Sequence, residues 1–132
     1  MMRFKVTLLA LFLAPLFAAH ADDEGNEWTR FRGPNGSGIS GAQAIPVKWT
    51  AKEYNWTIAL PGDGSSSPVV WKENLFVTCN DRTKSIRSVV CVNATDGKIH
   101  WRRDFPYVSY RMHRDNDFAS STPTVDTDGV VV

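Results

Sequence analysis

A near-repeat fifty-five residues apart is the feature that most constrains the fold of this chain. Residues 64–77 align without a gap on residues 119–132, and five of the fourteen aligned pairs are identical. Those pairs are Ser65/Ser120, Ser66/Ser121, Pro68/Pro123, Val70/Val125 and Val77/Val132. A repeat of this length, built from short apolar runs and turns, is typical of an array of sheet units.

A second trace of the repeat surrounds two tryptophans. Residues 54–62 and 98–106 are both expected to be strands. Each contains Trp, three further residues, a large apolar residue and then Pro, with Trp56 and Trp101 in equivalent positions. This offset is 45 residues, so we expect a ten-residue insertion within 107–119. Insertions of this kind map to loops on one edge of a repeat unit.

One complete repeat unit lies between these repeated segments. Strands are expected at about 67–71, 75–80, 87–93 and 98–105, with turns at 72–74 and 94–97. Gly97 suits the positive φ of a tight turn. Four antiparallel strands per period predict an all-β fold, a β-propeller of four-stranded blades of which about one full blade is present. We place that blade at 67–105 within a partial propeller at 56–132, with the next blade beginning at 120–132.

The first 21 residues have the pattern of a secretory signal. A basic start with Arg3 and Lys5 precedes an apolar run and an Ala19-His20-Ala21 cleavage site. The run is too short to cross a bilayer, which takes roughly 20 residues. We expect export to the periplasm or medium with cleavage after Ala21, the alternative being a buried N-terminal helix. Residues 22–55 then form a turn-rich arm.

Charge gives no reason to expect a nucleic-acid partner. Removing Arg3 and Lys5 from the 15 basic residues leaves 13 against 14 acidic ones, a formal net charge of −1. A protein with so little net charge has no overall electrostatic attraction for nucleic acid or for an anionic membrane surface. No segment after residue 21 is apolar enough to span a membrane.

The two cysteines, Cys79 and Cys91, lie in apolar runs of neighbouring strands. A hairpin centred near Ser85 would let the two sulfurs face each other, and the bridge would contribute on the order of 3 kcal/mol. The alternative is two small buried side chains that never meet.

The segment that contains the turn at 94–97 resembles a known repeat. Residues 91–101 resemble the tryptophan-docking repeat of PQQ-like (quinoprotein-type) β-propellers, whose pattern is Ala-x-Asp-x-x-Thr-Gly-Lys-x-x-Trp. Gly97, Lys98 and Trp101 match the pattern, while Cys91, Asn93 and Asp96 depart from it. The resemblance implies that the glycine permits the turn and that the indole stacks against a neighbouring blade.

The wider chain resembles secreted bacterial PQQ-like repeat proteins, related in fold to the propeller of outer-membrane barrel assembly (BamB-like). Members often open with Trp-x-x-Phe-Arg-Gly-Pro-x-Gly-x-Gly, matched at 28–38, and carry Ser-Ser-x-Pro-x-Val, matched with Pro68 and again with Pro123. On this resemblance the chain is expected to be an N-terminal fragment that needs the remaining blades of a larger chain for closure. Self-assembly of several copies into a ring is the alternative.

Two functions stay open on this resemblance. The first is a non-enzymatic scaffold that binds protein or polysaccharide. The second is the N-terminal part of a PQQ-dependent dehydrogenase, which would need a vicinal cysteine pair, a calcium site and a catalytic Asp. PQQ is implied only by the family, and no catalytic, cofactor or metal residue can be assigned from the sequence.

The inserted loop is the expected place for a partner surface. It mixes aromatic, basic and acidic groups, with Tyr110, Arg111, His113 and Arg114 as candidates, although a merely solvated loop is the alternative. His100 is expected at the surface. Residues 126–129 are expected to form a plain turn rather than a calcium loop, because the repeat aligns them with the turn at 71–74.

Overall fold

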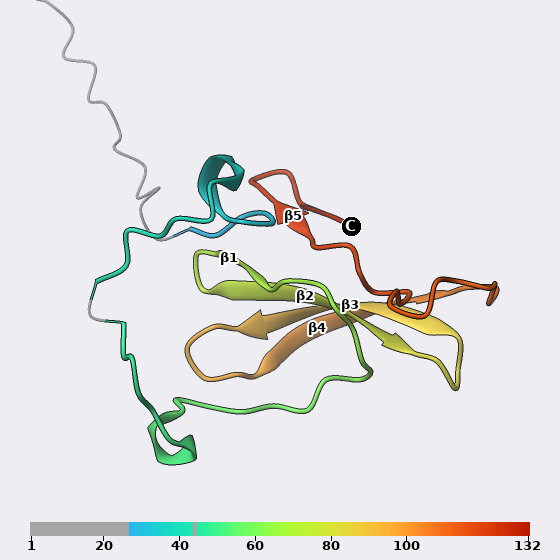
Figure 1. Ribbon diagram of the computed structural model, residues 1–132, viewed down its shortest axis with the longest axis horizontal. Helices are drawn as coiled ribbons and strands as arrows, with labels where there is room; N and C mark the ends of the chain where they lie inside the picture. The colour runs from blue at the N-terminus through green and yellow to red at the C-terminus, as the bar shows by residue number, and fades with distance from the viewer. Residues whose placement is uncertain (1–26, 44) are drawn as a thin grey trace, which may run out of the picture.

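The computed structural model describes residues 27–43 and 45–132 (Figure 1). The expected signal sequence and its cleavage site therefore lie outside the described residues. The described part is built of strands and irregular segments, with two single-turn 3-10 helices, η1 (Pro34–Gly36) and η2 (Ala51–Glu53). The all-β expectation is confirmed at this level.

A four-stranded antiparallel sheet forms the centre of the molecule. Its strands follow chain order: β1 (Val69–Trp71), β2 (Asn74–Asp81), β3 (Ile86–Asn93) and β4 (Ile99–Pro106). All four agree with the expected strands to within two residues. A second, two-stranded sheet of β5 (Thr124–Val125) and β6 (Val130–Val131) follows, also antiparallel.

Both faces of the four-stranded sheet are apolar. Because side chains alternate along a strand, β2 and β3 contribute one buried row to each face. Face A is centred on Val69, Phe76 and Cys91, and Val125 of β5 packs against it. Face B holds Val77, Cys79, Val90 and Val92, against which Trp56 and Ile58 pack. Two separate cores therefore lie on opposite sides of one sheet.

The segment at 54–62 does not form the expected strand. It is extended, but only Asp63 just beyond it pairs with the sheet, through an isolated bridge to Asn80. It lies over face B instead, because its apolar side chains at Trp56 and Ile58 are more favourably buried there than in a ladder at a sheet edge.

Four large aromatic side chains, Trp56, Trp71, Phe76 and Trp101, do not lie on one face of the sheet. Trp71 and Phe76 belong to face A, and Trp101 approaches Phe76 on that side with ring centroids 5.9 Å apart. Trp56 belongs to face B. The reason is that Trp56 lies outside the sheet, so strand alternation does not determine its side.

The arm touches the sheet at one point along the backbone. Trp28 and Val70 exchange two backbone hydrogen bonds of 2.9 and 2.8 Å, and the Thr29 carbonyl accepts a hydrogen bond from Val125. Trp49, the other tryptophan of the arm, is 59% exposed. The arm thus joins β1 and β5 at the edge where the two sheets meet (Figure 1).

Candidate functional site

The turn between β3 and β4 is a docking site for Trp56. Gly97 has φ +74°, and a Cβ built there would lie 2.7 Å from two atoms of the Trp56 ring. The indole Nε1 donates a hydrogen bond of 2.9 Å to the Ala94 carbonyl. Only glycine permits both this conformation and this approach.

The other residues of the repeat motif have different surroundings. Lys98 is exposed and pairs with Asp96, Nζ to Oδ2 2.7 Å. Trp101 is 37% exposed and contacts Phe76 of its own sheet. The docked indole is that of Trp56, which no sequence pattern assigned to this turn. The equivalence of Trp56 and Trp101 in the sequence, 45 residues apart, is the signal that could have pointed to Trp56.

The two copies of the repeat lie side by side. The Ser67 amide donates to the hydroxyl of its repeat equivalent, Thr122, at 3.0 Å. The Thr78 hydroxyl donates to the Ser121 carbonyl at 3.0 Å. The two segments that are similar in sequence are therefore also adjacent in space.

Asp117 joins the equivalent serines of the two copies. Its carboxylate accepts hydrogen bonds from Ser65 at 2.5 Å and from Ser120 at 3.3 Å, and also from the Ala119 amide at 2.6 Å. Desolvation by burial raises its pKa, but these hydrogen bonds outweigh burial and the pKa is lowered overall. Sequence reasoning missed this residue, because the pattern of residues 115–117 alone does not show that Ser65 lies beside them.

The equivalent prolines differ in burial. Pro123 is fully buried, whereas Pro68 is exposed and lines a hollow on face B. The second copy of the motif has a sheet to pack against, namely face A. The first copy has only the thin segment at 54–62 beside it, so its proline stays open to solvent.

The candidate disulfide between Cys79 and Cys91 is absent, and both cysteines are free and buried. The turn lies between Asp81 and Ile86, which puts Cys79 opposite Ser88 and Cys91 opposite Phe76. Cys79 belongs to face B and Cys91 to face A. Desolvation raises the pKa of both thiols. The alternative of two small buried side chains is therefore the correct one.

The inserted loop is held by stacked aromatic rings. Tyr107 stacks on Phe118 with centroids 4.1 Å apart, and Tyr110 meets Phe118 edge-on at 5.0 Å. The Tyr107 hydroxyl donates to Asn80 Oδ1 at 2.8 Å. This cluster closes the loop onto the β2–β3 end of the sheet.

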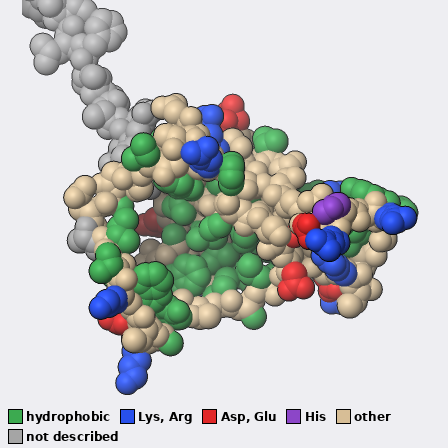
Figure 2. Space-filling model, in the orientation of Figure 1, with side chains coloured by type: hydrophobic (Ala, Val, Ile, Leu, Met, Phe, Trp, Pro, Cys, Tyr) green, Lys and Arg blue, Asp and Glu red, His purple; other side chains and the backbone are tan. Residues whose placement is uncertain are grey.

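The four residues proposed for a partner surface are arranged around that cluster. Tyr110 is 68% exposed. His113 and Arg114 both lie 3.4 Å from the carboxylate of Asp115, and Arg111 makes no ion pair within the described ranges 27–43 and 45–132. In Figure 2 this end of the molecule, on the right, gathers basic, acidic and histidine side chains.

A hollow of about 330 Å³ lies on face A beneath the loop. Arg87, Phe105 and Phe118 line it, together with Thr78 and Ser121. The Arg87 guanidinium is held over the Tyr107 ring, 5.8 Å from its centroid. This hollow combines aromatic walls with a cationic group at its rim.

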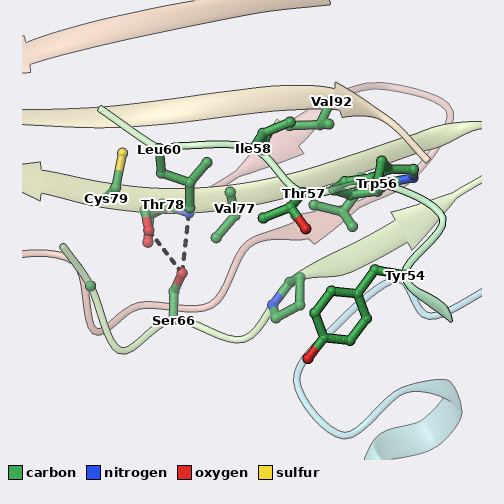
Figure 3. A pocket seen from close by; sticks show the side chains of 13 residues that line it. Tyr54, Trp56, Thr57, Ile58, Leu60, Ser66, Val77, Thr78, Cys79 and Val92 are labelled. Atoms are coloured by element: carbon green, nitrogen blue, oxygen red, sulfur yellow. Dashed lines mark hydrogen bonds between the residues drawn. The ribbon is translucent and has the colours of Figure 1, made fainter. Parts of the chain in front are cut away.

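A larger hollow of about 550 Å³ lies on face B, between the sheet and the segment at 54–60 (Figure 3). Its walls are mainly apolar, from Ile58 and Leu60 to Val77 and Val92. Ser66 and Thr78 form its polar side, where the Ser66 hydroxyl both donates to the Thr78 carbonyl and accepts from the Thr78 amide at 3.1 Å. Figure 2 shows hydrophobic side chains gathered in this central hollow.

The remaining expectations concern turns and ions. Residues 126–129 form a turn, in which Asp126 Oδ1 accepts hydrogen bonds from the amides of Asp128 and Gly129. His100 is exposed, as expected. Among residues 27–43 and 45–132 there is no group of three or more His, Cys, Asp or Glu placed to hold a metal ion. In the same part of the chain no helix has the length and apolarity to cross a bilayer.

No family model, curated protein or solved structure matched this chain.

Proposed function

We propose that the chain is an exported β-propeller repeat protein that acts as a non-enzymatic binding or scaffold module. One observation carries this proposal: the central sheet is apolar on both faces, and each face packs against a neighbouring repeat segment. A sheet of this kind needs a cover on both sides. Side-by-side sheets around an axis supply such covers in a propeller.

The faces through which neighbouring repeat units pack also support a propeller arrangement. Val125 and Val130 pack on face A, and their repeat equivalents, Val70 and Leu75, alternate onto the face B side. Face A of one unit thus receives the face B side of the next. The open hollow on face B is then the place where an earlier or closing unit would lie.

A PQQ-dependent dehydrogenase is the alternative from the resemblance, and the described residues do not fit the cofactor. The vicinal cysteine pair that it needs is not provided by Cys79 and Cys91, which lie on opposite faces of the sheet. The carboxylates with shifted pKa values, Asp81, Asp96, Asp104 and Asp117, are all shifted down by local hydrogen bonds. They act here as ionised acceptors that hold turns and strands.

The experiment that separates the two functions is a cofactor titration. The purified chain is mixed with PQQ and Ca²⁺, and its melting temperature and dye-linked oxidation of primary alcohols and aldoses are measured. We expect neither a shift in melting temperature nor quinone-dependent dye reduction. A saturable shift accompanied by turnover would overturn the binding-module proposal.

A further inference from the structure

We propose that the hollow on face A beneath the loop binds an anionic sugar residue of a polysaccharide, with Arg87 as its charge partner. This inference rests on the proposed binding function and specifies its ligand class. The hollow, at about 330 Å³, falls within the range of about 300–1,000 Å³ usual for ligand sites.

The cationic group is available. Arg87 is exposed and makes no ion pair in the part of the chain that the structure describes, whereas Arg102 and Arg114 are paired with Asp104 and Asp115. Its guanidinium is positioned by the Tyr107 ring beneath it. An unpaired and oriented guanidinium is suited to a carboxylate or sulfate, which it binds through two parallel hydrogen bonds.

The walls suit a sugar ring. Phe105 is 46% exposed and offers an apolar ring against which the C–H face of a pyranose can pack. Phe118, whose ring is stacked on Tyr107, also lines the hollow. Ser121 adds an exposed hydroxyl at the same hollow. Pockets of this type place a few polar groups within apolar walls and so orient the ligand.

A buried amide donor lies on the same face of the sheet as Arg87. Asn80 is 2% exposed and is the direct cross-strand partner of Arg87. Its Oδ1 accepts from Tyr107, but its Nδ2 has no acceptor among the described residues. Buried donors without an acceptor are rare in native proteins.

The charge balance of this end of the sheet agrees. Residues 81–88 and 102–117 contain seven Arg or Lys side chains and four Asp, a local net charge of +3 in a mature chain whose formal net charge is −1. Such a local surplus attracts a polyanion and makes its binding dependent on ionic strength.

The test is affinity electrophoresis of the full chain in gels containing polygalacturonate, dextran sulfate or neutral dextran. We expect retardation by at least one of the two anionic polymers, weakening with salt, and none by dextran. The polymer that retards the chain distinguishes a carboxylate from a sulfate. Equal retardation by dextran, or none by any polymer, would overturn the inference.

Variants separate this site from general charge. Arg87→Gln should weaken binding about tenfold, since a hydrogen bond to a charged group contributes about 1.5–3 kcal/mol. Arg87→Lys should recover part of that loss. Arg30→Gln, which removes the same charge from the arm, should bind as the unaltered chain does. Unchanged binding by a folded Arg87→Gln variant, checked by tryptophan fluorescence, would overturn the inference. That result would not decide the binding-module proposal, which the cofactor titration tests separately.

Discussion

Gly97 and Trp56 form the contact between residues on which the packing of face B depends. The glycine has a left-handed backbone, and the indole occupies the space where a side chain would be. The Trp56 hydrogen bond to Ala94 fixes the ring over the turn. A sequence motif that indicates only a turn is thus also a receptor for an aromatic side chain from another segment.

Gly97→Ala should therefore destabilise the fold. The left-handed conformation alone costs a residue with a Cβ about 1–2 kcal/mol, and displacement of Trp56 adds to that cost. Chemical denaturation followed by tryptophan fluorescence measures the change in the free energy of unfolding. Gly41→Ala is the matched control, because that site has open space and no positive φ. Equal stabilities of the two variants would contradict the docking role.

Asp117 predicts a pH dependence of the contact between repeats. Its pKa is lowered in the folded chain, so its stabilising contribution is present above the ordinary Asp pKa of about 3.9 and is lost as the pH falls through the folded value. The stability difference between the unaltered chain and Asp117→Asn should shrink from pH 7 to pH 3. Denaturant midpoints across that range measure it. A difference that stays constant or grows on acidification would show that the carboxylate charge is not responsible.

Among the elements, the strands and turns of the central sheet were predictable and the pairing register was not. Alternating apolar residues and the turn residues at 72–74 and 94–97 were enough to place the strands. The register of β2 on β3 depends on the tight turn centred between Thr83 and Lys84, where the Asp81 carboxylate accepts hydrogen bonds from both of their amides. Our expected centre at Ser85 reversed the relative facing of the two cysteines, because a shift by an odd number of residues exchanges the faces.

This register predicts that the two thiols stay reduced in the folded protein. Intact-mass measurement after denaturation in iodoacetamide should show two alkylated cysteines without prior reduction, and a reducing agent should leave the thermal midpoint unchanged. A peptide linking Cys79 to Cys91, lighter by about 2 Da than the two separate peptides, would contradict the register.

The candidate site itself was only partly predictable. The loop at 107–119 could be located as an insertion, and its mixed side chains could be named. That Arg87 of β3 lies beneath it could not, because the contact depends on Tyr107 and Phe118 folding the loop back onto the sheet. Contacts between distant segments of this kind leave no local pattern in a sequence.

For the whole molecule, export is the first consequence that can be measured. The expected cleavage after Ala21 predicts that the protein recovered from a secreting host begins at Asp22. N-terminal sequencing of the exported product checks this, with the cytoplasmic precursor as the control. A product that still begins at Met1 would contradict the secretory signal.

The two faces of the central sheet are covered unequally. Face A is covered by β5 and β6. Among the described residues, face B is covered only by the segment at 54–62, and a hollow of about 550 Å³ lies between that segment and the sheet. The exposed Pro68 and the buried Pro123 show the same asymmetry at equivalent positions. We interpret the central sheet as one blade of a stacked series.

A crystal or cryo-EM structure of the protein as its host produces it tests this claim most directly. The account predicts a further four-stranded sheet packed on Leu75, Val77 and Val92, with its face A toward them and Pro68 buried. A structure in which face B stays open to solvent, or is covered by a helix, would contradict it.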